Sequence, residues 1–426
     1  MKAATVFGTL ASAAAFLVPG LALWVPSGYS YGAALLLLTA VLGAPWWWRE
    51  CRVSVRSRWL LASIVAMGSI WAMDSAESAW RWGTLDRPSK YLLALPCVLF
   101  LLAHAPRPRW LWSGIAVGAV GSGVVAWAQV SWLGMPRAAG FTNAIQYGNL
   151  SVLLSLMCLV LLAIRPPELR RWHYGVLPLG VAAGLVASIL SHSRGGWLAW
   201  ALALPVRAGV LCQFVPGRRL LAGLLVLLCM VAALVYVQRH LLEERIDTAR
   251  SEVLRYENVG DAETSVGQRL AHWELAWRMG LEKPLLGWGK TGYDVEKLRR
   301  VQAGQAHPFV LQFGHVHNEV LDVFAKHGLL GVLALCLFYG VPFWLFWPGR
   351  RHVMVWAKAP DGSRQPVLDR TALALRAVGW TIPLAYLGFG FSQVFFAHNS
   401  GNLFYLFMVM LIHSCLQARE RDQALD

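Results

Sequence analysis

The chain has 426 residues, of which 57% are hydrophobic and only 14% are charged, and its formal net charge at pH 7 is +15. Soluble globular domains carry about 25% charged residues, so the composition excludes an ordinary soluble protein. The apolar residues fall into blocks of roughly 18–22, which is long enough for a helix to cross the hydrocarbon core of a bilayer. The sequence therefore predicts an all-α polytopic membrane protein.

About twelve apolar segments have the length of a transmembrane helix. The first also resembles a signal peptide, but its apolar stretch continues to Trp24 and further segments follow at once, which favours an uncleaved helix. Several tryptophans stand at segment ends, including Trp46, Trp47 and Trp48, as is typical of the lipid headgroup boundary. The segments lie near residues 4–25, 29–48, 58–74, 89–105, 109–132, 146–164, 174–191, 195–214, 219–238, 318–346, 371–392 and 401–417.

Arginines fill alternate connections between these segments. The positive-inside rule predicts that these connections, together with both chain termini, lie in the cytoplasm. Membrane topology then accounts for much of the positive charge, and no nucleic-acid partner is needed. The basic residues concerned include Arg49, Arg52, Arg56, Arg58, Arg107, Arg109, Arg165, Arg170, Arg171, Arg207, Arg218, Arg219, Arg350, Arg351, Arg364, Arg370, Arg419 and Arg421.

The opposite side, predicted to be periplasmic, holds one long loop and several short ones. Within the long loop, residues 264–282 alternate apolar and charged side chains with the period of an amphipathic helix, which ends before Pro284. Short outer loops are expected at 75–88, 133–145, 192–194 and 393–400. The predicted division is helices one to nine in 1–238, a periplasmic loop subdomain in 239–317, and helices ten to twelve in 318–426.

The run 314–331, GHVHNEVLDVFAKHGLLG, brings ionisable side chains to the mouth of an apolar helix. Ionisable residues at such a depth are costly to place and are commonly functional. His317, or alternatively His315, is the first candidate for a proton acceptor, because imidazole is mostly neutral at pH 7. Asn318 suits the N-cap of the following helix, and Glu319 is a candidate to assist a histidine. The simpler interpretation, an ordinary boundary histidine, is preferred for His272, His315, His327 and His398.

Cations also gather on the outer side, where topology does not require them. Arg194 occupies a very short loop and precedes two glycines, which let the backbone approach a ligand closely. Arg269 stands at the start of the amphipathic helix, while Lys90 and Arg137 are weaker candidates. A snorkelling or solvated side chain is the simpler explanation for each of them. Together they predict an anion site, and a lipid-linked diphosphate fits because arginine binds phosphate oxygens through two parallel hydrogen bonds.

One histidine and two arginines suffice for glycosyl transfer, with the histidine as the base for a sugar hydroxyl and the arginines neutralising a diphosphate leaving group. The pair His315 and His317 has no convincing third or fourth ligand nearby except Glu319, whereas zinc sites usually need three or four, and the chain contains no Asp-x-Asp motif. The seven cysteines form no C-x-x-C pair and are interpreted as packing residues. We therefore expect metal-independent chemistry without a cofactor.

Three stretches resemble the O-antigen ligase and polymerase superfamily of bacterial envelope enzymes. They are SRGGWLA at 193–199, GQRLAHWELAWRMGLEKPLLGWG at 267–289 and HNEVLDVFAKHGLLG at 317–331. In topology the resemblance covers the whole chain, with about twelve helices and a large periplasmic loop before the tenth. This arrangement is similar to that of a GT-C-like glycosyltransferase.

The resemblance implies roles for particular residues. Arg194 and Arg269 would hold the diphosphate of an undecaprenyl-linked O-antigen, and His317 would activate the acceptor hydroxyl. The reaction implied is an inverting transfer to lipid A–core oligosaccharide at the periplasmic face of the bacterial inner membrane. This chain adds His315 and Glu319 on either side of His317, so either could be the true base or orient it.

Three alternatives to a ligase are open. An O-antigen polymerase uses the same donor with another lipid-linked glycan as acceptor, and a protein O-oligosaccharyltransferase uses a protein hydroxyl. The Arg-x-x-x-Leu pattern from Arg194 to Leu198 and the single dominant loop favour the ligase. A transporter belongs to a different class and usually places its ionisable site near the bilayer midplane. Here the ionisable residues gather at one face, which favours surface chemistry on a membrane-held substrate.

Overall fold

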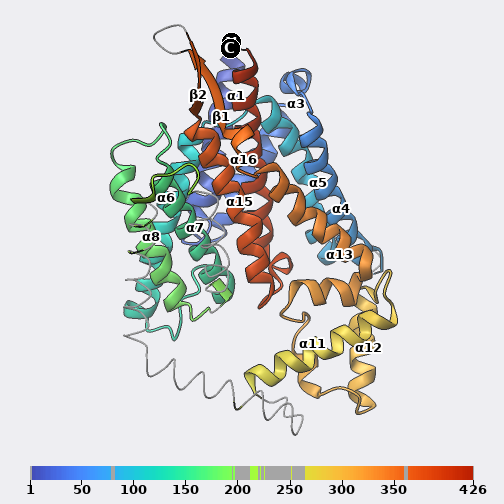
Figure 1. The fold of residues 1–426 in the computed structure, drawn as a ribbon. Coiled ribbons are helices and arrows are strands. Elements are labelled where there is room, and N and C mark those ends of the chain that lie inside the picture. The colour runs from blue at the N-terminus through green and yellow to red at the C-terminus, as the bar shows by residue number, and fades with distance from the viewer. Residues whose placement is uncertain are drawn as a thin grey trace.

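The structure is a computed structural model that describes residues 2–77, 82–193, 195–196, 212–218, 221, 225, 251, 264–358 and 363–425. Long helices dominate the described chain, as Figure 1 shows. The predicted segments 195–214 and 219–238 lie largely outside the described residues. Arg194 and nearly all of the first part of the long loop, 239–263, lie outside them as well.

The N-terminal half consists of long helices joined by short connections. The first long connection between them begins only after α6, which continues into a single π-helical turn, η2. The elements are α1 (Lys2–Leu21), α2 (Gly28–Leu42), α3 (Ala44–Trp47), the 3-10 turn η1 (Trp48–Glu50), α4 (Val55–Glu77), α5 (Trp82–Ala103), α6 (Pro108–Trp127), η2 (Ala128–Trp132), α7 (Ala144–Ile164) and α8 (His173–Leu190).

The C-terminal half combines three more long bundle helices with shorter elements. Two strands pair as an antiparallel hairpin, with Met354 opposite Leu368. The elements are α11 (Ser265–Glu282), α12 (Gly289–Gln302), η3 (Pro308–Gln312), α13 (Glu319–Leu345), α14 (Arg350–Val353), β1 (Met354–Lys358), β2 (Arg364–Leu368), α15 (Arg370–Gly390), η4 (Phe395–Ala397) and α16 (Asn399–Leu425).

The prediction of a helical multi-pass membrane protein is confirmed. Within the described residues, eight helices are long and apolar enough to span a membrane, and the bent pair Gly28–Leu42 and Ala44–Glu50 raises the number to nine if it is one span. α5 packs along α4 but carries charged residues in its first turns, which lower its hydropathy. The total of twelve spans stays a prediction, because two segments lie largely outside the described chain.

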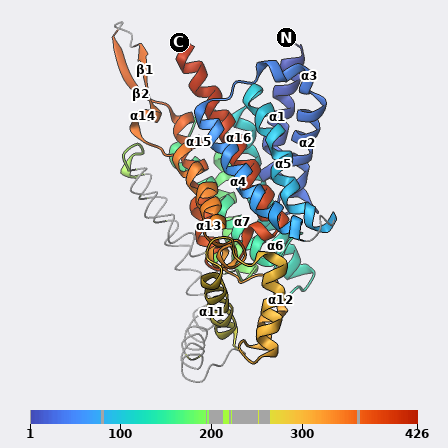
Figure 2. The ribbon, with the colours of Figure 1, turned by 90° about the vertical axis from the view of Figure 1, so that its right-hand side faces the viewer.

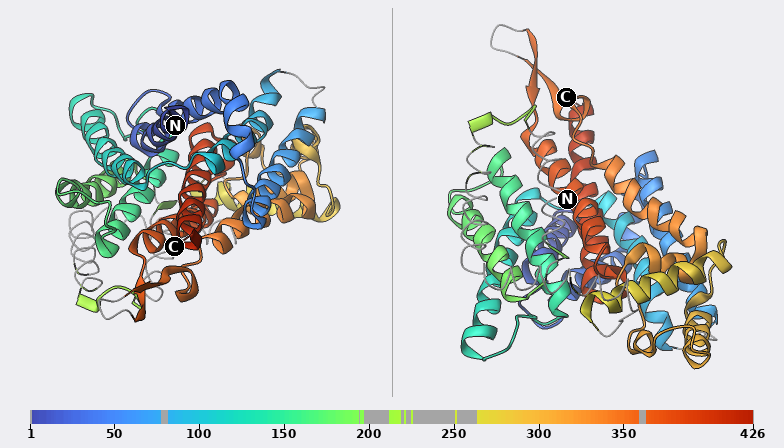
Figure 3. Two further views of the ribbon diagram at one scale, coloured as in Figure 1. Left: turned by 90° about the horizontal axis from the view of Figure 1, so that it is seen from above. Right: turned by 60° about the horizontal axis from the view of Figure 1, so that its bottom comes forward.

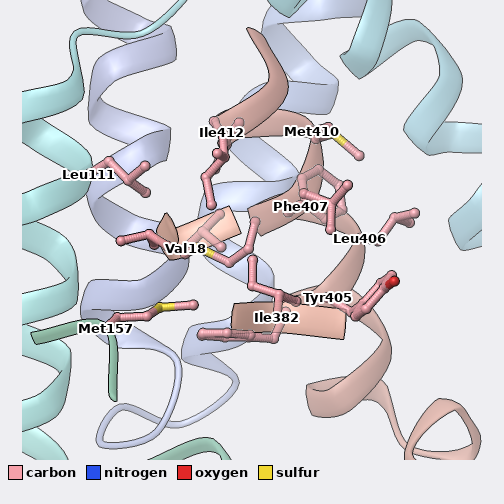
Figure 4. Close-up of a cluster of buried hydrophobic side chains, with 14 of the residues drawn as sticks. Val18, Leu111, Met157, Ile382, Tyr405, Leu406, Phe407, Met410 and Ile412 are labelled. Atoms are coloured by element: carbon pink, nitrogen blue, oxygen red, sulfur yellow. The ribbon is translucent and has the colours of Figure 1, made fainter. Parts of the chain in front are cut away.

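α15 and α16 form the centre of the bundle. In each of their spans 89% of the residues are buried, against 39% in α1 and α8. Figure 3 shows α16 surrounded by the other helices when the molecule is seen from above. Figure 4 shows the core there, where Ile412 and Phe407 of α16 meet Val18 of α1, Leu111 of α6 and Met157 of α7.

Small residues let the helices of the bundle approach closely. A Cβ added to Gly118 of α6 would lie 2.0 Å from the carbonyl oxygen of Pro19 in α1, and one added to Gly114 would lie 2.4 Å from that of Phe16. Lipid tails are as apolar as the side chains, so close packing replaces the hydrophobic effect in holding membrane helices together. The glycines four residues apart on α6 therefore fix its contact with α1.

The molecule has two distinct ends. Both chain termini and the β1–β2 hairpin lie at one end, while α11 and α12 lie at the other, as Figure 2 shows. This arrangement agrees with a long loop on the side opposite the termini. The sequence analysis anticipated α11, but neither α12 nor the hairpin. Which end faces the periplasm stays a prediction.

A backbone contact joins the loop region to α13. The helix breaks at Gly328, whose φ of 61° and ψ of −156° are not helical. The freed amides of Leu329 and Leu330 donate to the carbonyls of Pro284 and Leu285 at 2.7 and 3.2 Å. A Cβ at Gly328 would lie 2.4 Å from the carbonyl carbon of Leu285, so only glycine fits. The stretches PLLGW and HGLLG are thus paired backbone to backbone.

Candidate functional site

The loop that carries the two candidate histidines is held by buried charges. Lys326 donates to the carbonyl of Gly314 at 2.9 Å and forms an ion pair of 2.7 Å with Asp322. The same carboxylate accepts a hydrogen bond from the amide of Val316 at 3.0 Å. Both charged residues stand in the first turns of α13 and are almost fully buried. The loop is therefore fixed before α13 begins, at an N-cap formed by Asn318, which accepts from the Leu321 amide at 3.1 Å.

His315 and His317 both point at one amide oxygen. Oε1 of Gln393 lies 3.0 Å from Nδ1 of His317 and 3.1 Å from Nε2 of His315. The backbone amide of Val394 also donates to this atom, at 3.1 Å, which identifies it as the oxygen and not the nitrogen of the side-chain amide. Gln393 is 1% exposed and lies in the turn after α15.

This geometry determines the tautomer of each histidine. An amide oxygen only accepts hydrogen bonds, so the ring nitrogens that face Gln393 must carry the protons. Nε2 of a neutral His317 is then the nitrogen with the free lone pair. The backbone at His317 also adopts a left-handed φ of 56°, a conformation uncommon outside glycine, asparagine and aspartate. Such strain is typical of sites where a side chain must point in a set direction.

The surroundings keep both imidazoles neutral. Burial lowers the pKa of His317, the hydrogen bond to Gln393 partly opposes this, and the positive charge of Arg269 lowers it again. Burial and the neighbouring His317 lower the pKa of His315 to about 4. At neutral pH His317 is therefore in the form that accepts a proton.

Two further histidines complete a histidine cluster, which we define as His272, His315, His317 and His398. The ring centroids of His315 and His317 are 4.5 Å apart, His398 lies 5.7 Å from His315, and His272 lies 6.4 Å from His317. Burial lowers the pKa of His272 to about 4 and also lowers that of His398. The sequence analysis treated these two as ordinary boundary residues, since nothing local distinguishes them.

Arg269 is brought to the histidine cluster by α11. The helix begins behind an N-cap at Thr264, which accepts from the Gly267 amide at 3.0 Å. Arg269 is exposed in the second turn, close enough to His317 for its charge to lower the pKa of the imidazole. A small hydrophobic core, including Leu275, Met279, Tyr293, Val316 and Ala325, holds α11 and α12 against the loop and α13. The sequence analysis predicted that Arg269 and His317 share one site, and their joint role there stays a prediction.

Arg194 lies outside the described residues, but its neighbours on both sides are described. Ser193 donates to Oδ1 of Asn149 at 2.7 Å. Gly195 packs so closely that an added Cβ would lie 2.2 Å from Oγ of Ser392. Ser392 directly precedes Gln393. The convergence of Arg194 itself on His317 stays a prediction, to which these contacts are favourable.

The weaker cation candidates differ in their surroundings. Lys90 forms an ion pair with Asp86 and donates to Oδ1 of Asn399 at 2.7 Å, next to His398. Arg137 is exposed, and no hydrogen bond within the described chain joins it to the histidine cluster. Lys90 thus lies at the edge of the site, whereas Arg137 is not connected to it by these contacts.

Glu319 does not act on His317 directly. Its Oε2 accepts hydrogen bonds from the amides of Phe395 and Phe396, at 2.5 and 3.3 Å, and thereby caps η4. The carboxylate is 1% exposed and ties the first residue of α13 to the turn that carries Gln393 and His398. Glu319 is therefore placed to position the site across 76 residues of sequence, which no local pattern could reveal.

Arg87 is a site residue that the sequence analysis missed. Its guanidinium carbon lies 4.4 Å from the ring centroid of Trp71, and its Nη2 lies 3.5 Å from the carbonyl oxygen of Ala397. Its positive charge contributes, after burial, to the lowered pKa of His398. The only available signal was its position three residues before Lys90, in the outer loop.

Across the described residues, no group of three or more histidine, cysteine or acidic side chains has an arrangement that holds a metal ion.

The fold is a multi-pass helical bundle of a membrane protein. Its ionisable site, with a neutral histidine, an arginine and further cations, lies at the end that carries α11 and α12. Residues 179–336 match a family model described as O-antigen ligase. Over these residues the chain is similar to the O-antigen ligase family, as the sequence motifs indicated. Members of this family are membrane glycosyl-transferring enzymes.

The matched region and a relative extend this comparison. The region runs from α8 into α13, so it includes Arg269 and both loop histidines but ends before Gln393. An uncharacterised protein of Haemophilus influenzae is 27% identical over 333 residues, which cover 77% of this chain and 78% of that protein. This relative extends the similarity well beyond the family model.

Proposed function

We propose that the chain is an O-antigen ligase of the bacterial inner membrane. It transfers O-antigen glycan from undecaprenyl diphosphate to lipid A–core oligosaccharide at the periplasmic face. The observation that carries the proposal is the shared oxygen of Gln393, which leaves Nε2 of His317 as a neutral base beside the positive charge of Arg269. The similarity of residues 179–336 to the O-antigen ligase family supports the substrate class.

The reaction is a single displacement. Nε2 of His317 takes the proton of the acceptor hydroxyl while the hydroxyl oxygen forms a bond to the anomeric carbon of the donor. The bond from that carbon to the diphosphate oxygen breaks, and its electron pair leaves with undecaprenyl diphosphate. Arg269 and Arg194 stabilise the departing negative charge, as positively charged donors do in other phosphate-leaving reactions. Attack from the face opposite the leaving group inverts the anomeric configuration.

The arginines make a metal ion unnecessary in this scheme. A divalent cation on a sugar diphosphate serves to neutralise the leaving group, and two guanidinium groups supply the same charge. The chain also lacks the Asp-x-Asp motif that commonly holds such a cation. We therefore expect transfer to proceed in the presence of a chelator.

In the proposed topology, the site lies on the periplasmic side of the inner membrane. Residues 239–317 form a periplasmic subdomain over helices one to nine of 1–238 and helices ten to twelve of 318–426, with both termini in the cytoplasm. The termini and α11 lie at opposite ends of the molecule, which supports this arrangement. A cavity at this end would have to open both to the lipid leaflet, for the carrier, and to the periplasm, for the two glycans.

The test is reconstitution of the purified protein with lipid-linked O-antigen and lipid A–core oligosaccharide in the presence of EDTA. A ligated product of increased mass on a gel is expected. If lipid A–core is ignored while the lipid-linked glycan lengthens, the protein is an O-antigen polymerase. If only a protein acceptor is modified, it is a protein O-oligosaccharyltransferase. Loss of product with EDTA and its recovery with a divalent cation would contradict the metal-independent scheme.

A further inference from the structure

A cavity lies at the end of the molecule that carries the chain termini, far from the histidine cluster. It has a volume of about 480 Å³ and sits between the segment before α4 and the last turns of α16. The proposed glycosyl transfer makes no use of it. Its polar lining consists of Arg52, Ser54, Arg56, Gln417, Glu420 and Arg421.

Positive charge exceeds negative charge in and behind this cavity. Nη1 of Arg56 lies 2.8 Å from both carboxylate oxygens of Glu420. The buried Arg376 shares the same carboxylate, with its Nη2 2.6 Å from Oε1. One acid therefore serves two guanidinium groups, while Arg52 and Arg421 add two further positive charges to the lining. A bound anion would reduce this mutual repulsion.

The cavity wall is held in place by hydrogen bonds to the backbone. Arg421 donates to the carbonyl of Leu102 at 3.0 Å and to that of Arg52 at 2.8 Å. Arg376 donates to the carbonyl of Leu345 at 2.8 Å and is 1% exposed. Its Nε is buried and finds no hydrogen-bond partner among the described residues. Arg376 and Arg421 are thus organised before any ligand arrives, which reduces the entropy lost on binding.

The cavity lies where two candidate membrane spans end. The candidate spans of α4 and α16 begin at Val55 and end at Gln423, close to the cavity residues. Large exposed tryptophans stand nearby in the sequence, with Trp46 62%, Trp48 63% and Trp59 51% exposed. Exposed tryptophans of this kind mark the boundary between hydrocarbon and water.

We propose that this cavity is a binding site for a phosphate anion, and that it accepts the phosphodiester headgroup of an anionic phospholipid in the adjoining leaflet. Guanidinium groups match phosphate oxygens in geometry and charge, and basic pockets at helix ends are suited to lipid headgroups. A lipid headgroup and a free phosphate both present phosphate oxygens, so an experiment must distinguish which of the two ligands binds. The site lies at the end opposite α11 and does not depend on the proposed transfer reaction.

The experiment measures lipid binding to the purified full-length protein by native mass spectrometry. The probes are phosphatidylglycerol, phosphatidylcholine and inorganic phosphate, each titrated separately. We compare the wild type with Arg52→Gln and with the double variant Arg52→Gln/Arg421→Gln. The matched control is Arg58→Gln, because Arg58 is exposed in the first turn of α4, six residues after Arg52, but does not line the cavity.

We expect phosphatidylglycerol to bind more tightly than phosphatidylcholine to the wild type and to Arg58→Gln. In Arg52→Gln the affinity for phosphatidylglycerol should fall about tenfold, the loss of one charge-assisted hydrogen bond, and further in the double variant. Inorganic phosphate binding with the same variant pattern would identify a free phosphate as the source. Equal binding of both lipids and no phosphate binding would overturn the proposal, and so would an equal loss in Arg58→Gln. Ligase activity serves as a separate readout and should be unchanged in Arg52→Gln.

Discussion

At the scale of single residues, the amide oxygen of Gln393 decides what the histidines can do. Because both rings donate to it, neither can present its proton to a substrate, and His317 offers a lone pair instead. His317 and its loop were predictable, since ionisable residues at the start of an apolar helix are evident in the sequence. Gln393, His398 and Arg87 were not, because their contacts with the loop cross long stretches of chain and no local spacing encodes them.

Replacement of His317 by alanine should remove the base. A general base contributes about 10²- to 10⁴-fold to a reaction, so the rate of ligation should fall by that factor while the protein still enters the membrane. The rate is measured with purified variants at saturating donor. His352→Ala, an exposed histidine at the opposite end, is the control and should retain full activity. A large loss in His315→Ala together with near-normal activity in His317→Ala would move the base to His315.

Replacement of Gln393 by glutamate should change the pH dependence of the reaction. The variant keeps an acceptor oxygen but adds a negative charge, which favours the imidazolium and raises the pKa of His317. Activity needs the neutral ring, so it should begin to fall at a higher pH than in the wild type as the solution is acidified. The pH profile of kcat/KM reports this shift. Gln302→Glu adds the same charge at an exposed position on α12 and should leave the profile unchanged. An unshifted profile in Gln393→Glu would mean that Gln393 has only a structural role.

At the scale of elements, the helices themselves were predictable and their interruptions were not. Apolar length gives a helix in a membrane because every backbone group must be paired within the segment. The break at Gly328 escapes this logic, because the carbonyls that satisfy its free amides come from residues 284 and 285, in the loop region. The helix α12 and the β1–β2 hairpin were missed for another reason, since α12 is polar and the two strands are short, so neither forms an apolar stretch of transmembrane length.

Replacement of Gly328 by alanine should destabilise the protein. Its φ of 61° and ψ of −156° are accessible to glycine almost alone, and a Cβ would meet the carbonyl of Leu285 at 2.4 Å. Backbone strain of this kind costs about 1–3 kcal/mol, before the steric clash is counted. Thermal unfolding in detergent should show a lower Tm. Gly340→Ala in the same helix has open space around the added carbon and is the control. Equal Tm values for the two variants would contradict the backbone pairing.

Replacement of Arg269 by glutamine should impair donor use. Loss of a charge-assisted hydrogen bond of about 1.5–3 kcal/mol corresponds to a fall in kcat/KM of roughly 10- to 100-fold. Removing the positive charge also raises the pKa of His317, so the acid side of the pH profile should move to higher pH. Arg278→Gln, on the same helix and paired with Glu274, should behave like the wild type. Unchanged kinetics in Arg269→Gln would remove α11 from the donor site.

At the scale of the whole molecule, the distribution of charge predicted more than the distribution of apolar residues. Arginine-rich connections indicated one common side for both termini, and the termini do lie at one end of the molecule, opposite α11 and α12. Hydropathy alone does not identify every helix of the bundle as a membrane span. α5 is a full-length helix within the bundle, yet its charged first turns remove it from the helices that composition alone would assign to the membrane.

The orientation can be tested with single cysteines in a variant that lacks reactive native thiols. Gln302→Cys, on α12, should react in intact spheroplasts with a maleimide that cannot cross the inner membrane. Arg58→Cys, at the termini end, should react only after the membrane is permeabilised. Both positions are exposed, so accessibility to water does not distinguish them. The reverse pattern would place α11 and the histidine cluster in the cytoplasm, and would contradict the proposed ligation at the periplasmic face.

The pairing of residues 284–285 with residues 329–330 also has a consequence for protein engineering. Because the loop region that contains α11 and α12 shares backbone hydrogen bonds with α13, it is not a module that can be transplanted by itself. A hybrid that takes 264–317 from one relative and α13 from another would combine two segments whose close backbone contact at Gly287 and Gly328 had not evolved together. Exchanges of acceptor or donor preference between relatives should therefore be cut outside 264–331, so that the loop region and the first half of α13 are inherited as one piece.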